Sequence, residues 1–149
     1  MVGLALGTIL VALLGCGHSP TELTGSVDFQ TVLKDSLPGD MGQLPGEATV
    51  RDAASWQKIW MDLHHLNAPP VPAIDFSREM VILVVGPGCN GKVEITAIDR
   101  ERGDLAVRAE AKSCGNALCI LADFAVHVVR LPRFDGPVRF MVKRDDVLC

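Results

Sequence analysis

The apolar positions of the chain follow a helical period in one segment and an extended period in several others. Residues 53–66 place four large apolar side chains at the i, i+3, i+4 and i+7 spacing of one helix face: Trp56, Ile59, Trp60 and Leu63. Asp52 precedes this segment, where its carboxylate can cap the first helical turn. The three prolines in residues 67–74 cannot continue a helix. The pattern therefore predicts one amphipathic helix over residues 53–66.

From residue 79 onward the apolar positions alternate with polar ones or form short continuous runs. Five segments show this strand pattern: residues 80–85, 92–99, 105–111, 124–131 and 138–142. Residues 27–34 and 47–51 are two further strand candidates. Most connections between the five segments have the length of hairpin loops. The sequence therefore predicts an α+β fold, with a twisted antiparallel β-meander of five to seven strands and the amphipathic helix packed on one face.

The start of the chain is apolar and ends in a cysteine. Residues 2–14 carry no charged side chain, and Leu13-Leu14-Gly15-Cys16 matches the lipobox of bacterial lipoproteins. The run suits a signal peptide and is shorter than the roughly 20 residues that span a bilayer. It departs from the usual pattern because no Lys or Arg precedes it. We predict a lipoprotein signal peptide over residues 1–15 and lipidation, including palmitate, at Cys16; a secreted or buried segment with an incidental cysteine is the alternative.

The rest of the chain reads as a tether and one domain. Residues 16–26 are polar and turn-rich, and residues 27–149 suit a single domain with its own core. Gly17 follows the lipid site, and resemblance to Gram-negative lipoproteins then implies export to the periplasm and an anchor in the outer membrane of the cell envelope, in either leaflet. The formal net charge is −4 and no basic stripe occurs, so nucleic acid is not expected as a partner.

Four cysteines remain if Cys16 is lipidated: Cys89, Cys114, Cys119 and Cys149. An even number in an exported chain favours two disulfides, with three possible connectivities. Alternate loops of a meander lie at one end, which would gather all four thiols. Neighbouring strands favour Cys89–Cys114 with Cys119–Cys149, and Cys114–Cys119 with Cys89–Cys149 is the alternative. A zinc site is the rival interpretation, although no C-x-x-C pair occurs.

Three patterns suggest chemistry and have structural alternatives. Residues 86–92 match G-x-x-x-x-G-K, but Val93 replaces the Ser or Thr of a phosphate loop and a strand pattern follows, so a hairpin turn is favoured. His64 and His65 end the predicted helix, where capping is favoured over metal binding. The third pattern is a thiol nucleophile system: Cys89, His127 and Asp123. It is disfavoured because His127 lies mid-strand and Cys89 at the strand ends.

Structural roles are also favoured for two tryptophans and one aspartate. Trp56 and Trp60 are predicted to pack in the core against the sheet. Asp75 is predicted to hydrogen-bond nearby backbone N–H groups in a turn. We therefore predict no catalytic residue, no metal site and no cofactor, and expect that the protein is not an enzyme.

Several motifs occur in a recognisable order: WQKIW at 56–60, VPAIDFSREMV at 71–81, a glycine turn at 86–91 before the strand pattern at 93–95, and VRF at 138–140. Through these motifs, residues 47–142 resemble the PrcB C-terminal domain family. The family is named after a lipoprotein component of bacterial surface protease complexes. The turn GPGCNGK departs from the family's longer turn and lacks its aromatic residue. The resemblance implies an exported, often lipidated protein that binds and stabilises a protease precursor, and it implies no catalytic residues.

The sequence thus predicts an exported, lipid-anchored protein-binding or scaffolding domain, with an exported protease among the candidate partners. Its contacts are expected from the exposed turn that holds Pro87, Gly88 and Asn90. A protease inhibitor-like domain is the second hypothesis. An enzyme of unrecognised chemistry, acting through His127 or Asp75, is the third.

Overall fold

The computed structural model describes residues 25–39, 42, 44–65, 68–114 and 122–147. The predicted signal peptide, most of the tether, and the cysteines Cys16, Cys119 and Cys149 lie outside the described residues.

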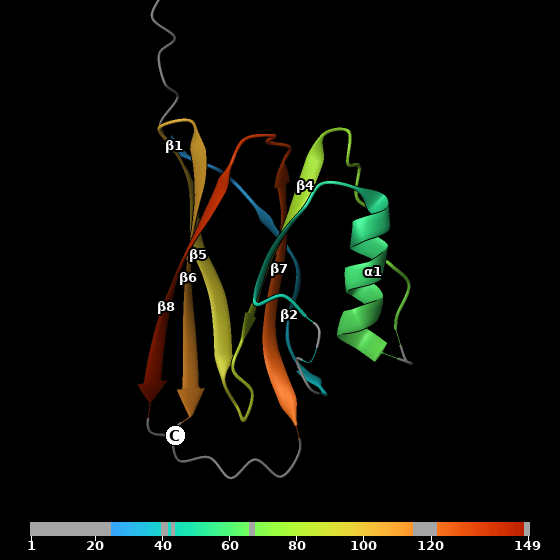
Figure 1. Cartoon of the computed structure of the whole chain (residues 1–149), viewed down its shortest axis with the longest axis vertical. Coiled ribbons are helices and arrows are strands. Elements are labelled where there is room, and N and C mark those ends of the chain that lie inside the picture. Colours follow the sequence, from blue (N-terminus) through green and yellow to red (C-terminus); the bar gives the residue numbers. More distant parts are fainter. Residues whose placement is uncertain (1–24, 40–41, 43, 66–67, 115–121, 148–149) are drawn as a thin grey trace, which may run out of the picture.

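The described residues form two sheets and one helix, arranged in three layers (Figure 1). The elements are β1 Gly25–Ser26, β2 Gln30–Pro38, β3 Glu47–Val50, α1 Ala53–His64, β4 Glu79–Gly86, β5 Lys92–Glu101, β6 Asp104–Cys114, β7 Asp123–Pro132 and β8 Val138–Val147. One sheet has the strand order β1-β5-β6-β8 and the other has the order β2-β7-β4-β3. We call them the first and the second sheet. The α+β class is confirmed.

The predicted single meander of five to seven strands is wrong in its pairing and its strand count. Strand β4 pairs with β7 and β3 instead of β5, and β6 runs parallel to β8. Strands β4 and β7 are almost continuously buried, so each needs cover on both faces, which the middle of a three-layer structure provides. The two-residue strand β1 makes the eighth described strand and lies within the predicted tether.

Two apolar cores lie on opposite faces of the second sheet. The core between the sheets includes Met80 and Ile82 of β4 together with Ile98 and Val107 of the first sheet. The other core joins the second sheet to α1 and includes Leu83 and Phe124, Trp56, Trp60 and Leu63. Alternation of side chains along β4 and β7 sends successive residues into the two cores.

Helix α1 confirms the sequence prediction, with its end at His64 instead of residue 66. The carboxylate of Asp52 accepts the backbone N–H of Ser55 at 2.8 Å and caps the first turn. The indole N–H groups of Trp56 and Trp60 donate to the carbonyl oxygens of Pro72 and Pro69, at 3.0 and 2.9 Å. The two tryptophans therefore pack in the core and also hold the proline-rich segment against the helix.

The described cysteines lie at one end of the molecule, as predicted. Successive strands from β4 to β8 alternate in direction even though they belong to two sheets, so the turn after β4 and the end of β6 meet at the lower end of Figure 1. The sulfur of Cys114 lies 3.5 Å from the carbonyl oxygen of Asn90 in that turn. The cysteines gather at this end because successive strands alternate in direction, whichever strands pair with one another.

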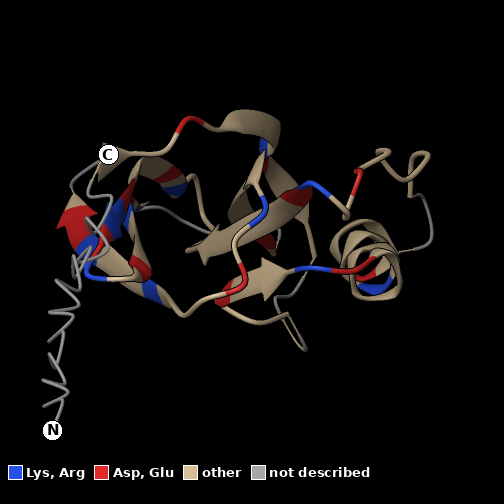
Figure 2. Ribbon diagram, turned by 90° about the horizontal axis from the view of Figure 1, so that it is seen from above, with Lys and Arg blue, Asp and Glu red and all other residues tan. Residues whose placement is uncertain are grey.

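Acidic and basic residues are interspersed along the ribbon of the described chain (Figure 2). On the first sheet, for example, Arg108 pairs with both Asp99 and Glu101, and Arg139 pairs with Glu101 and Asp104. The mixed pattern agrees with the absence of a basic stripe in the sequence.

Candidate binding groove

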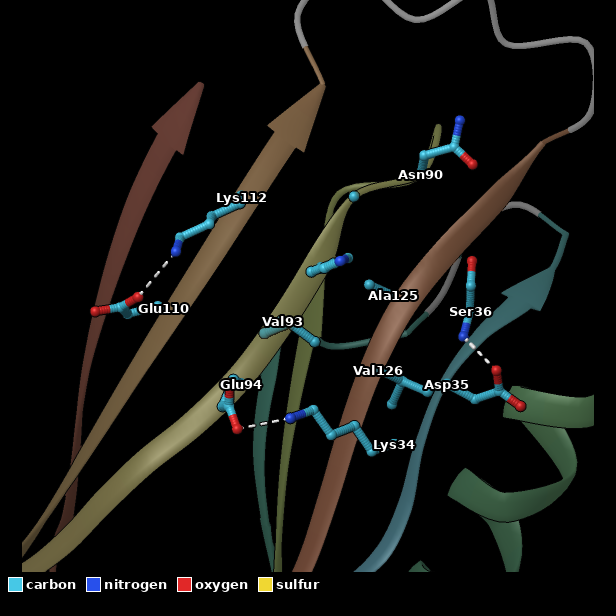
Figure 3. Close-up of a pocket in the computed structure, with 12 residues that line it drawn as sticks. Lys34, Asp35, Ser36, Asn90, Val93, Glu94, Glu110, Lys112, Ala125 and Val126 are labelled. Atoms are coloured by element: carbon cyan, nitrogen blue, oxygen red, sulfur yellow. Dashed lines mark hydrogen bonds and ion pairs between the residues drawn. The ribbon is translucent and has the colours of Figure 1, made fainter. Parts of the chain in front are cut away.

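A groove of about 440 Å³ opens where the two sheets meet along β2 and β5, beside the turn after β4 (Figure 3). We call it the β2–β5 groove. Its lining combines apolar and charged residues from four strands and the turn: Lys34, Asp35, Ser36, Asn90, Gly91, Lys92, Val93, Glu94, Glu110, Lys112, Ala125 and Val126. Cavities of this size accept small ligands or a few residues of a peptide.

The groove is open because β1 covers only one end of β5. Strand β1 pairs with Asp99 and Arg100, and the N–H of Val27 donates to the carbonyl of Ile98 at 2.7 Å. A bulge between Ile95 and Ala97 follows, and below it β5 has no strand on this side among the described residues. The lower part of β5 is therefore a free sheet edge that faces the groove.

His127 joins the two sheets behind the groove. Its side chain is only 3% exposed, and its Nδ1 accepts the backbone N–H of Ile95 at 2.8 Å. Because Nδ1 accepts, the ring proton is on Nε2, which donates to the hydroxyl of Thr31 at 3.0 Å. Burial lowers the pKa of His127, the charge of Lys34 lowers it further, and Glu94 opposes the shift. A neutral imidazole therefore acts as a structural link between β7, β5 and β2.

An ion pair spans the groove. The ammonium of Lys34 on β2 lies 2.6 Å from the carboxylate of Glu94 on β5 (Figure 3). The hydrogen bond and the charge of Lys34 lower the pKa of Glu94. Glu110 and Lys112 form a second pair at 3.4 Å, whereas Lys92 has no ion-pair partner among the described residues. Most of the charges are therefore neutralised, and Lys92 is the basic group left to meet a ligand.

The turn after β4 forms the lower wall and is firmly fixed. Cys89 and Asn90 adopt left-handed φ values of 59° and 62°. The carboxylate of Asp123 accepts the backbone N–H of Cys89 and, at 2.8 Å, the hydroxyl of Ser36. The hydrogen bond from Cys89 lowers the pKa of Asp123 most, and the one from Ser36 lowers it further. A Cβ at Gly88 would lie 1.9 Å from the carbonyl oxygen of Asp123, so the close approach requires glycine.

The predicted contact residues are only partly at the surface. Pro87 and Gly88 are half-buried against β7, while Asn90 is exposed and lines the groove. The tip contributes to the groove through Asn90 and Gly91 instead of projecting as a separate loop.

The structure assembles none of the suggested chemical sites, although it brings Asp123 next to Cys89. Cys89 is disulfide-bonded and the Asp123 carboxylate contacts its backbone, while His127 has other partners. Residues 86–92 lead into strand β5, so this turn does not begin a helix as a phosphate loop does. His64 lies 3.0 Å from the carbonyl of Trp60 through Nδ1, whereas the ring of His65 packs on Gly39.

Asp75 forms the predicted turn. Its carboxylate accepts the backbone N–H of Ser77 at 3.1 Å and the hydroxyl of the same residue at 2.5 Å. Its backbone carbonyl accepts the N–H groups of Arg78 and Glu79, which leads the chain into β4. The residue is structural in this arrangement.

Cys89 and Cys114 both form disulfides. Because Cys119 and Cys149 lie outside the described residues, the favoured pairing of Cys89 with Cys114 and of Cys119 with Cys149 stays a prediction.

Sequence reasoning missed most of the groove. Lys34 and Glu94 are 60 residues apart in the chain, and the two strands that carry them belong to different sheets. The only local signal is the alternation of charged residues along 92–94 and 110–112, which indicates an exposed sheet face. Nothing local indicates that this face borders a groove.

Comparisons with known protein families, curated proteins and solved structures found no match. The resemblance to the PrcB C-terminal domain family stays a prediction. In the described part of the chain, no helix is long and apolar enough to cross a membrane.

Proposed function

We propose that the chain is a lipid-anchored protein of the cell envelope whose folded domain binds another exported protein at the β2–β5 groove. The observation that carries the proposal is the groove itself. It combines apolar residues with a stretch of β5 that no described strand covers, and with Lys92, which has no ion-pair partner among the described residues. A preformed site of this kind needs little reordering on binding, which limits the entropic cost.

The ionisable groups around the groove support recognition over catalysis. The Nδ1 of His127 is occupied by Ile95, and the carboxylate of Asp123 is occupied by the turn. Glu94 is held by Lys34. The neutral imidazole and the two carboxylates therefore stabilise the walls of the groove through these contacts.

The sequence supports a location in the cell envelope. The apolar run before Cys16 supports export and lipidation there, with the outer membrane as the expected site. The family resemblance supports an exported protease as the partner. Labelled palmitate should attach to the wild-type chain and not to Cys16→Ser, and labelling of both or of neither would contradict the anchor.

Crosslinking in intact cells tests the binding site. A photoreactive amino acid at position 92 would face the groove, and one at Met61, which is 47% exposed on α1, is the matched control. We expect one exported protein to crosslink from position 92 and not from position 61. Equal patterns from the two positions would contradict binding at the groove.

A further inference from the structure

We propose that the groove takes an extended peptide segment, which adds as a strand to residues 92–95 of β5 in line with β1. The inference rests on the proposed function for its natural partner, and it specifies the partner's conformation and charge.

The hydrogen bonds of β5 show which way its backbone groups point. The N–H of Ile95 points away from β6, because it donates to His127 on the second sheet. In an antiparallel ladder, residues two apart direct their backbone groups to the same side. The N–H and carbonyl of Val93 therefore also point away from β6, toward the groove that Val93 lines.

Strand β1 already uses the same edge farther along. The carbonyl of Ile98 points to this side and accepts the N–H of Val27. Above the bulge the even-numbered Ile98 directs its backbone groups to this edge, and below it the odd-numbered Val93 and Ile95 do so. The bulge between Ile95 and Ala97 causes this change because it adds one residue to β5. An added strand beside Val93 would thus continue the line of β1 on the first sheet, as in other strand-addition complexes.

The ion pair across the groove does not prevent entry. The side chains of Lys34 and Glu94 are 44% and 57% exposed, and exposed pairs contribute little to stability. They can separate or rearrange around an inserted backbone.

The residues that line the groove also indicate the charge and polarity of the added segment. Lys92 is exposed and alternates with the buried Val93, which places it on the outer face of the first sheet at the rim of the groove. It has no ion-pair partner among the described residues, so an acidic side chain on the added strand would pair with it. The residues on either side of this acid would face inward, toward Ala125. The occupant is therefore an extended segment in which an acidic residue alternates with small apolar residues.

A synthetic peptide tests strand addition independently of the natural partner. The probe is the acetylated and amidated peptide Thr-Val-Glu-Val-Thr, added to the full-length lipidated chain in detergent micelles. We expect chemical-shift changes at the amides of Val93 and Glu94 and slower hydrogen exchange at Val93. A matched pair of peptides is N-methylated on alternate residues. Methylation on the set facing β5 should weaken binding about tenfold, and methylation on the other set should not.

Charge reversal completes the test. A peptide with Lys in place of its Glu should bind the wild-type chain more weakly, and Lys92→Glu should reverse this preference. Absence of peptide binding, or equal loss from both methylated peptides, would overturn strand addition while leaving the crosslinking result for the proposed function intact. Register-dependent peptide binding without a crosslinked protein in cells would support strand addition and contradict the proposed partner.

Discussion

Single residues at the junction of the sheets determine how the groove is held open. His127 accepts from Ile95 on one sheet and donates to Thr31 on the other, so one ring fixes three strands. Protonation would place an N–H on Nδ1 opposite the N–H of Ile95, where two donors cannot pair. The link therefore requires the neutral imidazole.

This requirement makes the stability of the fold depend on pH. The pKa of His127 is lowered from its ordinary value of 6.5 by burial and by Lys34, so the unfolded chain binds the proton more readily than the folded chain. The contribution is fully present above about pH 6.5 and is lost as the pH falls toward the folded pKa. Urea denaturation between pH 7.5 and 5.5 should show a falling free energy of unfolding.

The control for that measurement is His127→Asn, whose amide oxygen can accept from Ile95 and does not titrate. We expect this variant to lose about 1–3 kcal/mol at pH 7.5, because the bond to Thr31 is lost, and to show a weaker dependence on pH. The same slope in both proteins would contradict the role of His127.

The close approach of Gly88 to β7 leads to a second prediction about a single residue. A methyl group there would meet the backbone of Asp123, so Gly88→Ala should destabilise the chain by about 1–3 kcal/mol. Gly46→Ala is the control, because its added Cβ would meet no described atom within 4 Å apart from its chain neighbours, and its effect should stay within about 0.5 kcal/mol. Thermal unfolding of the two variants compares them, and similar losses would refute the proposed close contact.

For the helix and strands, local sequence signals predicted α1 better than they predicted the two sheets. The cap at Asp52 and the spacing of the tryptophans depend on residues within two helical turns, which the sequence displays directly. Strand pairing depends on distant residues. Strand β4 joins β7 because both are apolar on both faces, although the chain makes two other strands between them. The groove was missed for the same reason, since its ion pair joins β2 to β5.

The cap on α1 can be tested against a surface pair on the same helix. Asp52→Ala removes two hydrogen bonds with Ser55 and should cost about 0.5–2 kcal/mol in the free energy of unfolding. Asp62→Ala removes an exposed pair with Lys58 and should cost about 0.3–0.5 kcal/mol. Urea denaturation resolves the difference, and a smaller loss from Asp52→Ala would argue against the cap.

Cys89 belongs to the turn that forms the lower wall of the groove, and the sulfur of Cys114 approaches Asn90 in that turn. The disulfide of Cys89 therefore helps to hold the wall in place. The gathering of these strand ends was predictable because the direction of successive strands alternates.

Reduction should therefore weaken the fold. Each disulfide is expected to contribute about 2–4 kcal/mol, so the reduced chain should unfold at a clearly lower urea concentration than the oxidised chain. Mass spectrometry after alkylation under non-reducing conditions should find no free thiol at the four cysteines of the mature domain. Four alkylated cysteines in the exported protein would refute the disulfides.

Recognition at the β2–β5 groove is tested by the affinity of the crosslinked partner for two charge-reversed variants. Lys92→Glu alters the groove, whereas Arg102→Glu makes the same change in charge in the turn between β5 and β6, at the other end of β5. If the groove binds the partner, Lys92→Glu should weaken binding about tenfold and Arg102→Glu should leave the Kd unchanged. An unchanged Kd for Lys92→Glu would contradict recognition at the β2–β5 groove.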